Sequence, residues 1–174
     1  MIGLFFGSTN GNTAAVAGLI QRELKEQARI EVELFNIADY YLEEMLEFSH
    51  LIVGIPTWDI GQLQRDWETS IEELDELDLQ NKQVAVFGLG DQVGYPDTFG
   101  DAVFFVADKL ESQGAALVGA WPTEGYSFSG SWALRDGRFI GLMIDEDNQS
   151  DLTPERVRLW VRQLVDEFGL SLSE

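Results

Sequence analysis

The chain has 174 residues, of which 45% are hydrophobic and 11% aromatic, and it carries 31 acidic against 11 basic residues, for a formal net charge of −20. This length suits one well-buried core and is short for two, so we expect a single domain over residues 1–174. The excess negative charge repels nucleic acid and anionic membranes, attracts basic protein partners and favours a monomer through self-repulsion.

The residue inventory excludes several kinds of site. The chain has no cysteine and a single histidine, His50. A disulfide framework, a thiolate metal site, an iron–sulfur cluster, a cysteine nucleophile and a multi-histidine metal site are therefore ruled out. The apolar run that starts at Ile2 has no basic leader, and no run approaches the ~20 residues that span a bilayer, so we expect a cytoplasmic protein.

Five short apolar runs predict strands. They lie at residues 2–6, 30–35, 51–55, 84–87 and 115–121, and all but the second are nearly continuous. Continuous runs of this length are typical of strands that are covered on both faces. A segment rich in Gly, Ser and aromatic residues, 122–137, then separates the fifth run from residues 138–144 and is predicted to be an insertion.

Helical spacing appears between the strands. Residues 13–28 predict a first helix, 101–113 another, and a last helix begins near residue 153, where Thr153 is the expected N-cap and Pro154 the first helical residue. The expected apolar positions of the three helices are Val16, Leu19, Ile20 and Leu24; Phe104, Phe105 and Leu110; and Val157, Trp160, Val161 and Leu164. Alternating strands and helices predict a doubly wound α/β domain with a parallel sheet.

The loop after the first strand has the composition of a phosphate site. Residues 8–13 combine short hydroxyl and amide side chains with a glycine, at the start of a helix where free N–H groups bind anions. The loop lacks the Lys of a nucleotide-triphosphate loop and does not match the dinucleotide pattern G-x-G-x-x-G. On its own, this segment is equally compatible with a simple turn.

Two further loops follow the third and fourth strands. They run over residues 56–61 and 88–95 and carry Trp58 and Tyr95. In open α/β sheets ligands bind beyond the carboxyl ends of the strands, where these loops and residues 8–13 meet. Each aromatic residue alone would be interpreted as a packing residue, but together they are placed to stack on both faces of a flat ring.

These segments resemble a long-chain flavodoxin over the whole chain. The resemblance rests on residues 7–13, 56–61, 90–97 and 145–149, in this order, and on 121–128, which is similar to the loop that splits the fifth strand in the long-chain class. It implies a five-stranded parallel sheet in the order 2-1-3-4-5, with a long insertion in the fifth strand. Flavodoxin with FMN is itself one of the examples of ligands that bind beyond the carboxyl ends of the strands, so this position does not support the resemblance independently.

The resemblance also implies a function. The chain would be a low-potential one-electron carrier with non-covalent FMN, shuttling electrons through the semiquinone/hydroquinone couple, and not an enzyme. Its implied partners are basic redox proteins: NADP reductases, photosystems or ferredoxin-dependent oxidoreductases. An acidic run, Asp66, Glu68, Glu72, Glu73, Asp75, Glu76 and Asp78, is either an ordinary solvated helix face or a docking surface for them.

The implied cofactor site comprises residues from all of these loops. Trp58 and Tyr95 would flank the isoalloxazine, Asp91 would contact its pyrimidine edge, Asp147 the ribityl chain, and the peptide within Asp59–Gly61 would reorient on reduction. Asn10 departs from the threonine usual in the family. The full set is Ser8, Thr9, Asn10, Gly11, Asn12, Thr13, Pro56, Thr57, Trp58, Asp59, Ile60, Gly61, Gly88, Leu89, Gly90, Asp91, Gln92, Gly94, Tyr95, Asp97, Phe99 and Asp147.

Two other classes of protein fit the sequence less well. An FMN enzyme such as a quinone reductase would need a nicotinamide site, and the chain has no second glycine-rich fingerprint. A phosphoacceptor module would need an acidic pair after the first strand and a lysine after the fifth, and neither is present. The acids Asp136, Asp145, Glu146, Asp147 and Asp151 superficially suggest calcium, but the loop glycine and terminal Glu at the required spacing are missing, so we expect no metal.

Overall fold

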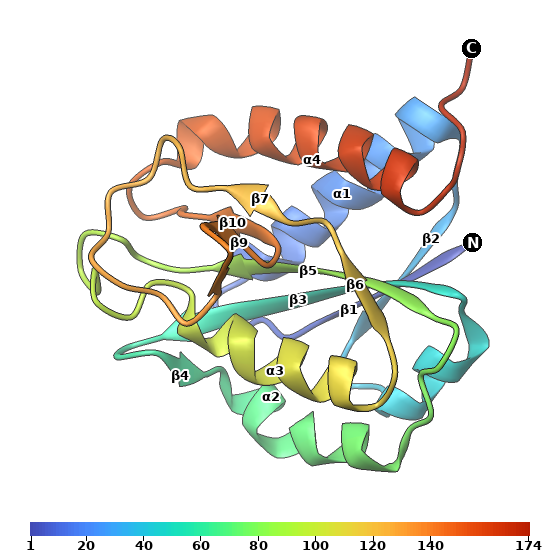
Figure 1. Cartoon of the computed structure of the whole chain (residues 1–174), viewed down its shortest axis with the longest axis horizontal. Coiled ribbons are helices and arrows are strands. Elements are labelled where there is room, and N and C mark those ends of the chain that lie inside the picture. Colours follow the sequence, from blue (N-terminus) through green and yellow to red (C-terminus); the bar gives the residue numbers. More distant parts are fainter.

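A parallel sheet between two layers of helices organises the molecule (Figure 1). The computed structural model describes all residues 1–174. The sheet contains β1 (Ile2–Phe6), β2 (Val32–Asn36), β3 (His50–Trp58), β5 (Gln83–Leu89) and β10 (Leu142–Ile144) in the order β10-β5-β3-β1-β2. The short β4 (Gln62–Leu63) pairs antiparallel with the end of β3.

The fifth position in the sheet is shared by two short strands. β6 (Ala116–Val118) pairs with the first half of β5, and β10 pairs with its second half, both parallel. Between them an insertion forms a small antiparallel sheet of β7 (Trp121–Pro122), β8 (Leu134–Arg135) and β9 (Arg138–Phe139) in the order β7-β9-β8. The expected order 2-1-3-4-5 with a divided fifth strand thus corresponds to β2-β1-β3-β5 followed by β6 and β10.

The sequence placed the ends of this divided strand wrongly. The predicted strand 115–121 ends at Val118, and Trp121 pairs with Phe139 in the small sheet. Gly119 has a φ of +90°, and its carbonyl oxygen accepts a hydrogen bond from the Trp160 indole at 2.8 Å, which turns the chain out of the main sheet.

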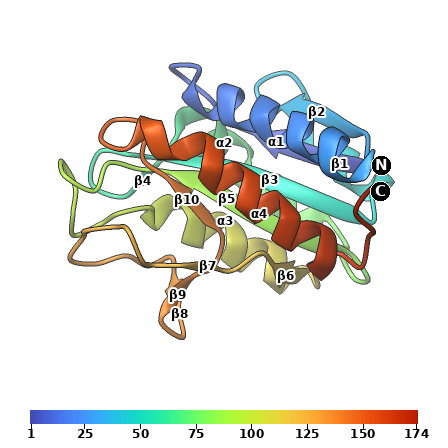
Figure 2. The same cartoon turned by 90° about the horizontal axis from the view of Figure 1, so that it is seen from above.

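The helices cover both faces of the sheet. α1 (Asn12–Ala28) and α4 (Thr153–Glu167) lie side by side on one face, and α2 (Arg65–Ser70) and α3 (Asp101–Ser112) lie on the other (Figures 1 and 2). Three 3₁₀ helices complete the chain: η1 (Leu42–Glu47), η2 (Ile71–Glu76) and η3 (Ser150–Leu152). None of the helices is both long enough and apolar enough to cross a membrane.

A core cluster of 47 buried residues joins the sheet to the helices, which explains the continuous apolar strands. The expected inner faces are buried in α4, at Val157, Trp160, Val161 and Leu164, and in α1 at Val16, Ile20 and Leu24, with Leu19 half-buried. In α3 the expectation was wrong for two positions, because Phe105 is exposed and Phe104 only half-buried. Both pack against Trp132 of the insertion, while smaller residues such as Val103 and Val106 face the sheet.

The predicted cap of α4 was also wrong. Leu152 is the N-cap, so Thr153 and Pro154 are the first two helical residues. The Thr153 hydroxyl donates to the Glu146 carboxylate instead of capping the helix. This bond ties the start of α4 to the loop that follows β10, which is one wall of the site described next.

Candidate functional site

A cavity of about 250 Å³ opens where the carboxyl ends of β1, β3, β5 and β10 meet. It lies at the point where the strand order reverses, since the chain leaves β1 toward β2 on one side and continues from β3 to β5 on the other. Its lining is Asn10, Asn12, Thr13, Pro56, Thr57, Trp58, Asp59, Leu89, Gly90, Asp91, Tyr95, Glu146 and Asp147. No lysine or arginine is among these residues.

The loop after β1 brings the N-terminus of α1 to the cavity. Gly11 is the N-cap of α1 with a φ of +89° and has no side chain to cap the helix, and the first turn contains no acid. The Asn10 Oδ1 accepts the Asn12 N–H at 3.1 Å, and the Ser8 hydroxyl oxygen accepts the Ala14 N–H at 3.4 Å. A helix N-terminus free of negative side chains is a favourable position for a phosphate group.

Trp58, the last residue of β3, and Tyr95, in the loop after β5, both line the cavity. The Trp58 side chain is half-buried, and its indole Nε1 is buried without a hydrogen-bond partner. Tyr95 is 37% exposed at the end of the turn that follows β5. An unpaired buried donor beside a hollow of this size is the feature that a bound polar ring would complete.

The backbone between the two strands β3 and β4 is in an unusual conformation. Asp59 has a φ of +47° and Gly61 a φ of +78°, and the Gly61 N–H donates to the Asp59 carbonyl oxygen at 3.0 Å. Left-handed backbone at a non-glycine residue is uncommon and stores strain. The carboxylate of Asp101, at the start of α3, lies directly behind Gly61.

Acidic side chains form the wall opposite the helix N-terminus. The Asp91 carboxylate accepts the Gly94 N–H at 2.7 Å, and this bond, with those from Asn148 and Val93, lowers the pKa of Asp91. Burial raises the pKa of Asp147, and the negative charges of Asp91, Asp145 and Glu146 raise this pKa further. The wall is therefore strongly negative.

Asp145 shares this wall but has a structural use. Its side chain is fully buried, and carboxylate oxygens of Asp91, Asp145 and Asp147 lie within 4.8 Å of one another. The oxygens of Asp145 accept hydrogen bonds from the backbone and side-chain N–H groups of Gln92 and Asn148. Amide donors thus satisfy the buried carboxylate.

The structure divides the predicted site residues into two groups. Twelve of them line the cavity, from Asn10, Asn12 and Thr13 through Trp58 to Asp147. The other members do not line it: Ser8, Thr9, Gly11, Ile60, Gly61, Gly88, Gln92, Gly94, Asp97 and Phe99.

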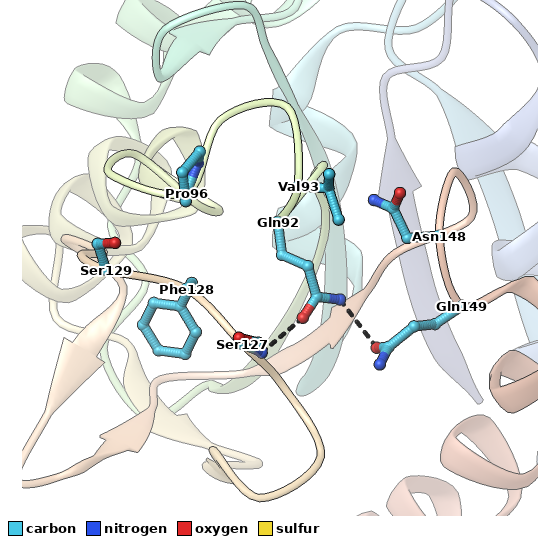
Figure 3. A pocket seen from close by; sticks show the side chains of 8 residues that line it. All are labelled: Gln92, Val93, Pro96, Ser127, Phe128, Ser129, Asn148 and Gln149. Carbon is cyan, nitrogen blue, oxygen red and sulfur yellow. Dashed lines mark hydrogen bonds between the residues drawn. The ribbon is translucent and has the colours of Figure 1, made fainter.

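Several residues of the second group have clear positions elsewhere. Ser8 and Thr9 line a separate hollow with Arg65, Gly88 is part of β5, and Phe99 is buried against Phe139. The Gln92 side chain points into a different cavity (Figure 3). Glu146 lines the cavity and was not predicted, although its place inside the 145–149 motif is a signal that would have found it.

The fold and the cavity at its switch point define a doubly wound α/β protein with a candidate ligand site, and comparison with known proteins specifies the family. The model of the flavodoxin family matches residues 4–160. A flavodoxin from Picosynechococcus sp. is 50% identical over 97% of this chain and 98% of its own, and one from Haemophilus influenzae is 45% identical over 98% and 97%. The chain therefore belongs to the flavodoxin family.

Solved structures agree with this family. A Fusobacterium nucleatum flavodoxin mutant bound to flavin mononucleotide superposes with a TM-score of 0.90 at 30% identity, covering 95% of both chains. The unmutated protein, also bound to flavin mononucleotide, gives 0.88 at 28% identity. Flavodoxins carry electrons on FMN between redox proteins and are not enzymes, so the expected family, fold class, cofactor and functional class are confirmed.

Proposed function

We propose that this chain is a low-potential one-electron carrier that holds FMN in the cavity between the loops after β1, β3 and β5. The observation that carries the proposal is that Trp58, at the end of β3, and Tyr95, in the loop after β5, line the same cavity, and that the buried Trp58 Nε1 has no hydrogen-bond partner. Bound FMN supplies the electron-accepting ring. The protein binds it, orients it and sets its potentials.

Each wall of the cavity has its own part in binding. The N-terminus of α1 receives the phosphate, Trp58 and Tyr95 stack on the ring, and Asp91 and Asp147 face the ring edge and the ribityl chain. The left-handed backbone at Asp59 and Gly61 lies beside the cavity, which Asp59 lines, so a peptide of this segment would be the one to meet the ring edge. A glycine at this position allows the peptide to reorient without steric cost.

The charge of the walls favours a low potential. A negative charge about 10 Å from the ring, at an effective dielectric near 20, opposes an added electron by ~1.7 kcal/mol, or about 70 mV. Asp91, Glu146 and Asp147 line the cavity without a lysine or arginine beside them. They make the fully reduced cofactor a strong electron donor.

The exposed acids point to basic partners. Of the acidic run, Glu68, Glu72 and Glu76 are exposed and make no side-chain hydrogen bond. Asp75 pairs with Lys109, Glu73 accepts the Leu42 N–H and Asp78 accepts the Gln80 N–H. The exposed charges favour encounter with basic redox proteins such as NADP reductases, photosystems and ferredoxin-dependent oxidoreductases. A monomer in the cytoplasm remains the predicted form and location.

An anaerobic redox titration of the FMN-reconstituted protein tests the proposal. We expect binding of one FMN per chain and reduction in two separate one-electron steps, seen as an absorbance intermediate that rises and then falls. A direct two-electron bleach, or a chain that does not bind FMN, would contradict it. NADPH oxidation by the purified protein alone would instead indicate a flavin enzyme.

A further inference from the structure

Gln92 is buried, but its side chain faces away from the FMN cavity. It is 4% exposed and is the only buried residue of the turn 91–95. Its side chain lies in a second cavity of about 510 Å³, among residues of the insertion and of the segment before α4 (Figure 3). Gln92 therefore does not contact the cofactor directly.

Every polar atom of the Gln92 side chain is used. Its Nε2 donates to the Gln149 Oε1 at 2.9 Å, and its Oε1 accepts the Ser127 N–H at 2.6 Å (Figure 3). The Nε2 also donates to the Asp145 Oδ2 at 2.7 Å, and the backbone N–H of Gln92 donates to the same oxygen at 3.1 Å. One side chain thus joins the segment between β10 and α4 to the backbone of the insertion.

The same network continues beyond Gln92. The Gln149 Oε1 also accepts from the Arg156 Nη1 at 2.8 Å, and the Gln149 Nε2 donates to the Gly125 carbonyl oxygen at 2.9 Å. Asn148 donates to both Asp91 and Asp145. The insertion is thereby held at Gly125 and, through Gln92, at Ser127.

We propose that Gln92 is a positioning residue, which fastens the turn 91–95 to the insertion and thereby makes the insertion a determinant of FMN affinity and of the second reduction potential. The turn has no apolar anchor of its own, since Val93 is 70% exposed. It nevertheless carries Asp91 and Tyr95, which line the FMN cavity. This inference rests on the proposed function of that cavity.

The physical reason is the cost of leaving a buried carboxylate and a backbone N–H without their hydrogen-bond partner. Without the Gln92 side chain, Asp145 loses a charge-assisted hydrogen bond and the Ser127 N–H loses its acceptor. The turn then samples positions in which the Asp91 carboxylate and the Tyr95 ring no longer meet the flavin. FMN binds less tightly, and the second electron is added more easily because Asp91 repels it less.

Two variants and one matched control test the inference in the FMN-loaded protein. Gln92→Leu removes the whole side-chain amide, Ser127→Pro removes the insertion's N–H and leaves Gln92 in place, and Ser127→Ala keeps that N–H and is the control. The measurements are FMN affinity, both reduction potentials, the free energy of unfolding and hydrogen exchange at the Val93 and Gly94 amides. Those amides donate to Asp91 and report on the turn itself.

We expect Gln92→Leu to weaken FMN binding by about tenfold or more and Ser127→Pro by about threefold. In both, the second potential rises and exchange at Val93 and Gly94 accelerates, while Ser127→Ala behaves as wild type. If Gln92→Leu does not fold, the comparison of Ser127→Pro with Ser127→Ala decides. An unchanged FMN affinity and second potential in Ser127→Pro, or equal changes in Ser127→Ala, would overturn the proposal.

The failure of the proposed function is a separate outcome. It would appear in the wild-type protein, as absence of FMN binding or of two one-electron steps. Failure of the inference would appear only in the variants: the wild-type protein binds FMN and titrates in two steps, and the variants have the same FMN affinity and the same potentials as the wild type.

Discussion

Trp58 reaches the FMN cavity from the end of β3 and Tyr95 from the loop after β5, and protein atoms cover each of them only partly. Such aromatic side chains have stacking area left over for a ligand. Single residues therefore set the affinity and the potentials of the cofactor, and substitutions at Tyr95, Gly61 and Asp147 separate the contributions of stacking, backbone conformation and charge.

The first substitution removes a stacking ring. We expect Tyr95→Ala to weaken FMN binding by roughly 10- to 100-fold, because stacking on an aromatic side chain contributes ~1–3 kcal/mol. The potential of the second step should rise as the electron-rich ring is lost. Fluorescence titration of FMN and a redox titration measure both. Tyr41→Ala is the control, since Tyr41 is 74% exposed and outside the cavity; equal values in the two variants would remove Tyr95 from the stacking role.

The second substitution tests the backbone at Gly61. Gly61 and Gly137 both have a φ of +78°, but only a Cβ at Gly61 would meet a neighbour, 3.0 Å from the Asp101 carboxylate. We expect alanine at either position to lower the free energy of unfolding by ~1–2 kcal/mol, because L residues disfavour left-handed backbone. Only Gly61→Ala should also weaken FMN binding. Denaturant unfolding and FMN titration check the pair, and an effect of Gly137→Ala on FMN affinity would contradict the assignment.

The third concerns the raised pKa of Asp147, which burial and then Asp91 produce. A carboxyl with a raised pKa holds its proton more tightly when folded, so its ionisation destabilises the folded chain as the pH rises through that pKa. We expect Asp147→Asn to raise the free energy of unfolding of the FMN-free protein at pH 7. The gain should vanish below about pH 3.9, where the unfolded carboxyl is also protonated. Glu72→Gln, which neutralises an exposed acid away from Asp91 and Asp147, controls for net charge. A gain in the free energy of unfolding that does not depend on pH would refute the explanation.

At the scale of elements, the sequence predicted what depends on periodicity and missed what depends on tertiary contacts. The apolar runs at residues 2–6, 51–55 and 84–87 each became part of a central strand, because these strands are covered on both faces. The bounds of the short helices α2 and η2 were not predicted, since Trp67, Ile71 and Leu74 are too few apolar residues among acids to give a helical period. Only packing against the sheet shows that Trp67 and Leu74 are buried.

The candidate site was predicted in the same uneven way. The loops were found because strand ends and glycine-rich turns are local signals, and twelve of the predicted residues line one cavity. The direction of a side chain is not a local signal. Gln92 sits between two cavity-lining residues of its turn, yet its amide is drawn to Asp145, 53 residues further along the chain.

Arg156 is a buried link between α4 and the insertion. Arg156 is 8% exposed, its guanidinium lies 4.0 Å from the centre of the Tyr126 ring, and it donates to Gln149 and Gly125. We expect Arg156→Leu to lower the free energy of unfolding by ~2 kcal/mol, through the lost hydrogen bonds and cation–π contact.

Arg158 is the matched control on the same helix. It is exposed and pairs only with Glu155, so Arg158→Leu should change the free energy of unfolding by less than ~0.5 kcal/mol. Urea denaturation of both variants distinguishes the two cases. Similar losses in both would show that Arg156 acts only as a surface charge.

At the scale of the whole molecule, the net charge of −20 is the dominant property. The acidic side chains differ in their contacts: some accept hydrogen bonds from N–H groups or pair with lysine and arginine side chains of the same chain, and others are exposed without a partner. Glu68 and Glu72 are exposed near α2, whereas Glu26 and Glu33 are exposed at the end of α1 and the start of β2, toward the amino ends of the strands and away from the cavity.

These two pairs test whether the charge steers partners to the cofactor edge. We expect the association rate with a basic redox partner to fall steeply with added salt, because exposed charges are screened within ~8–10 Å at 0.1–0.15 M. The double variant Glu68→Gln/Glu72→Gln should lower the low-salt rate about threefold. Glu26→Gln/Glu33→Gln removes the same two charges from the far end and should change it less. Stopped-flow electron transfer measures each rate, and either a salt-independent rate or equal effects of the two double variants would show that partners are not steered by the acids beside α2.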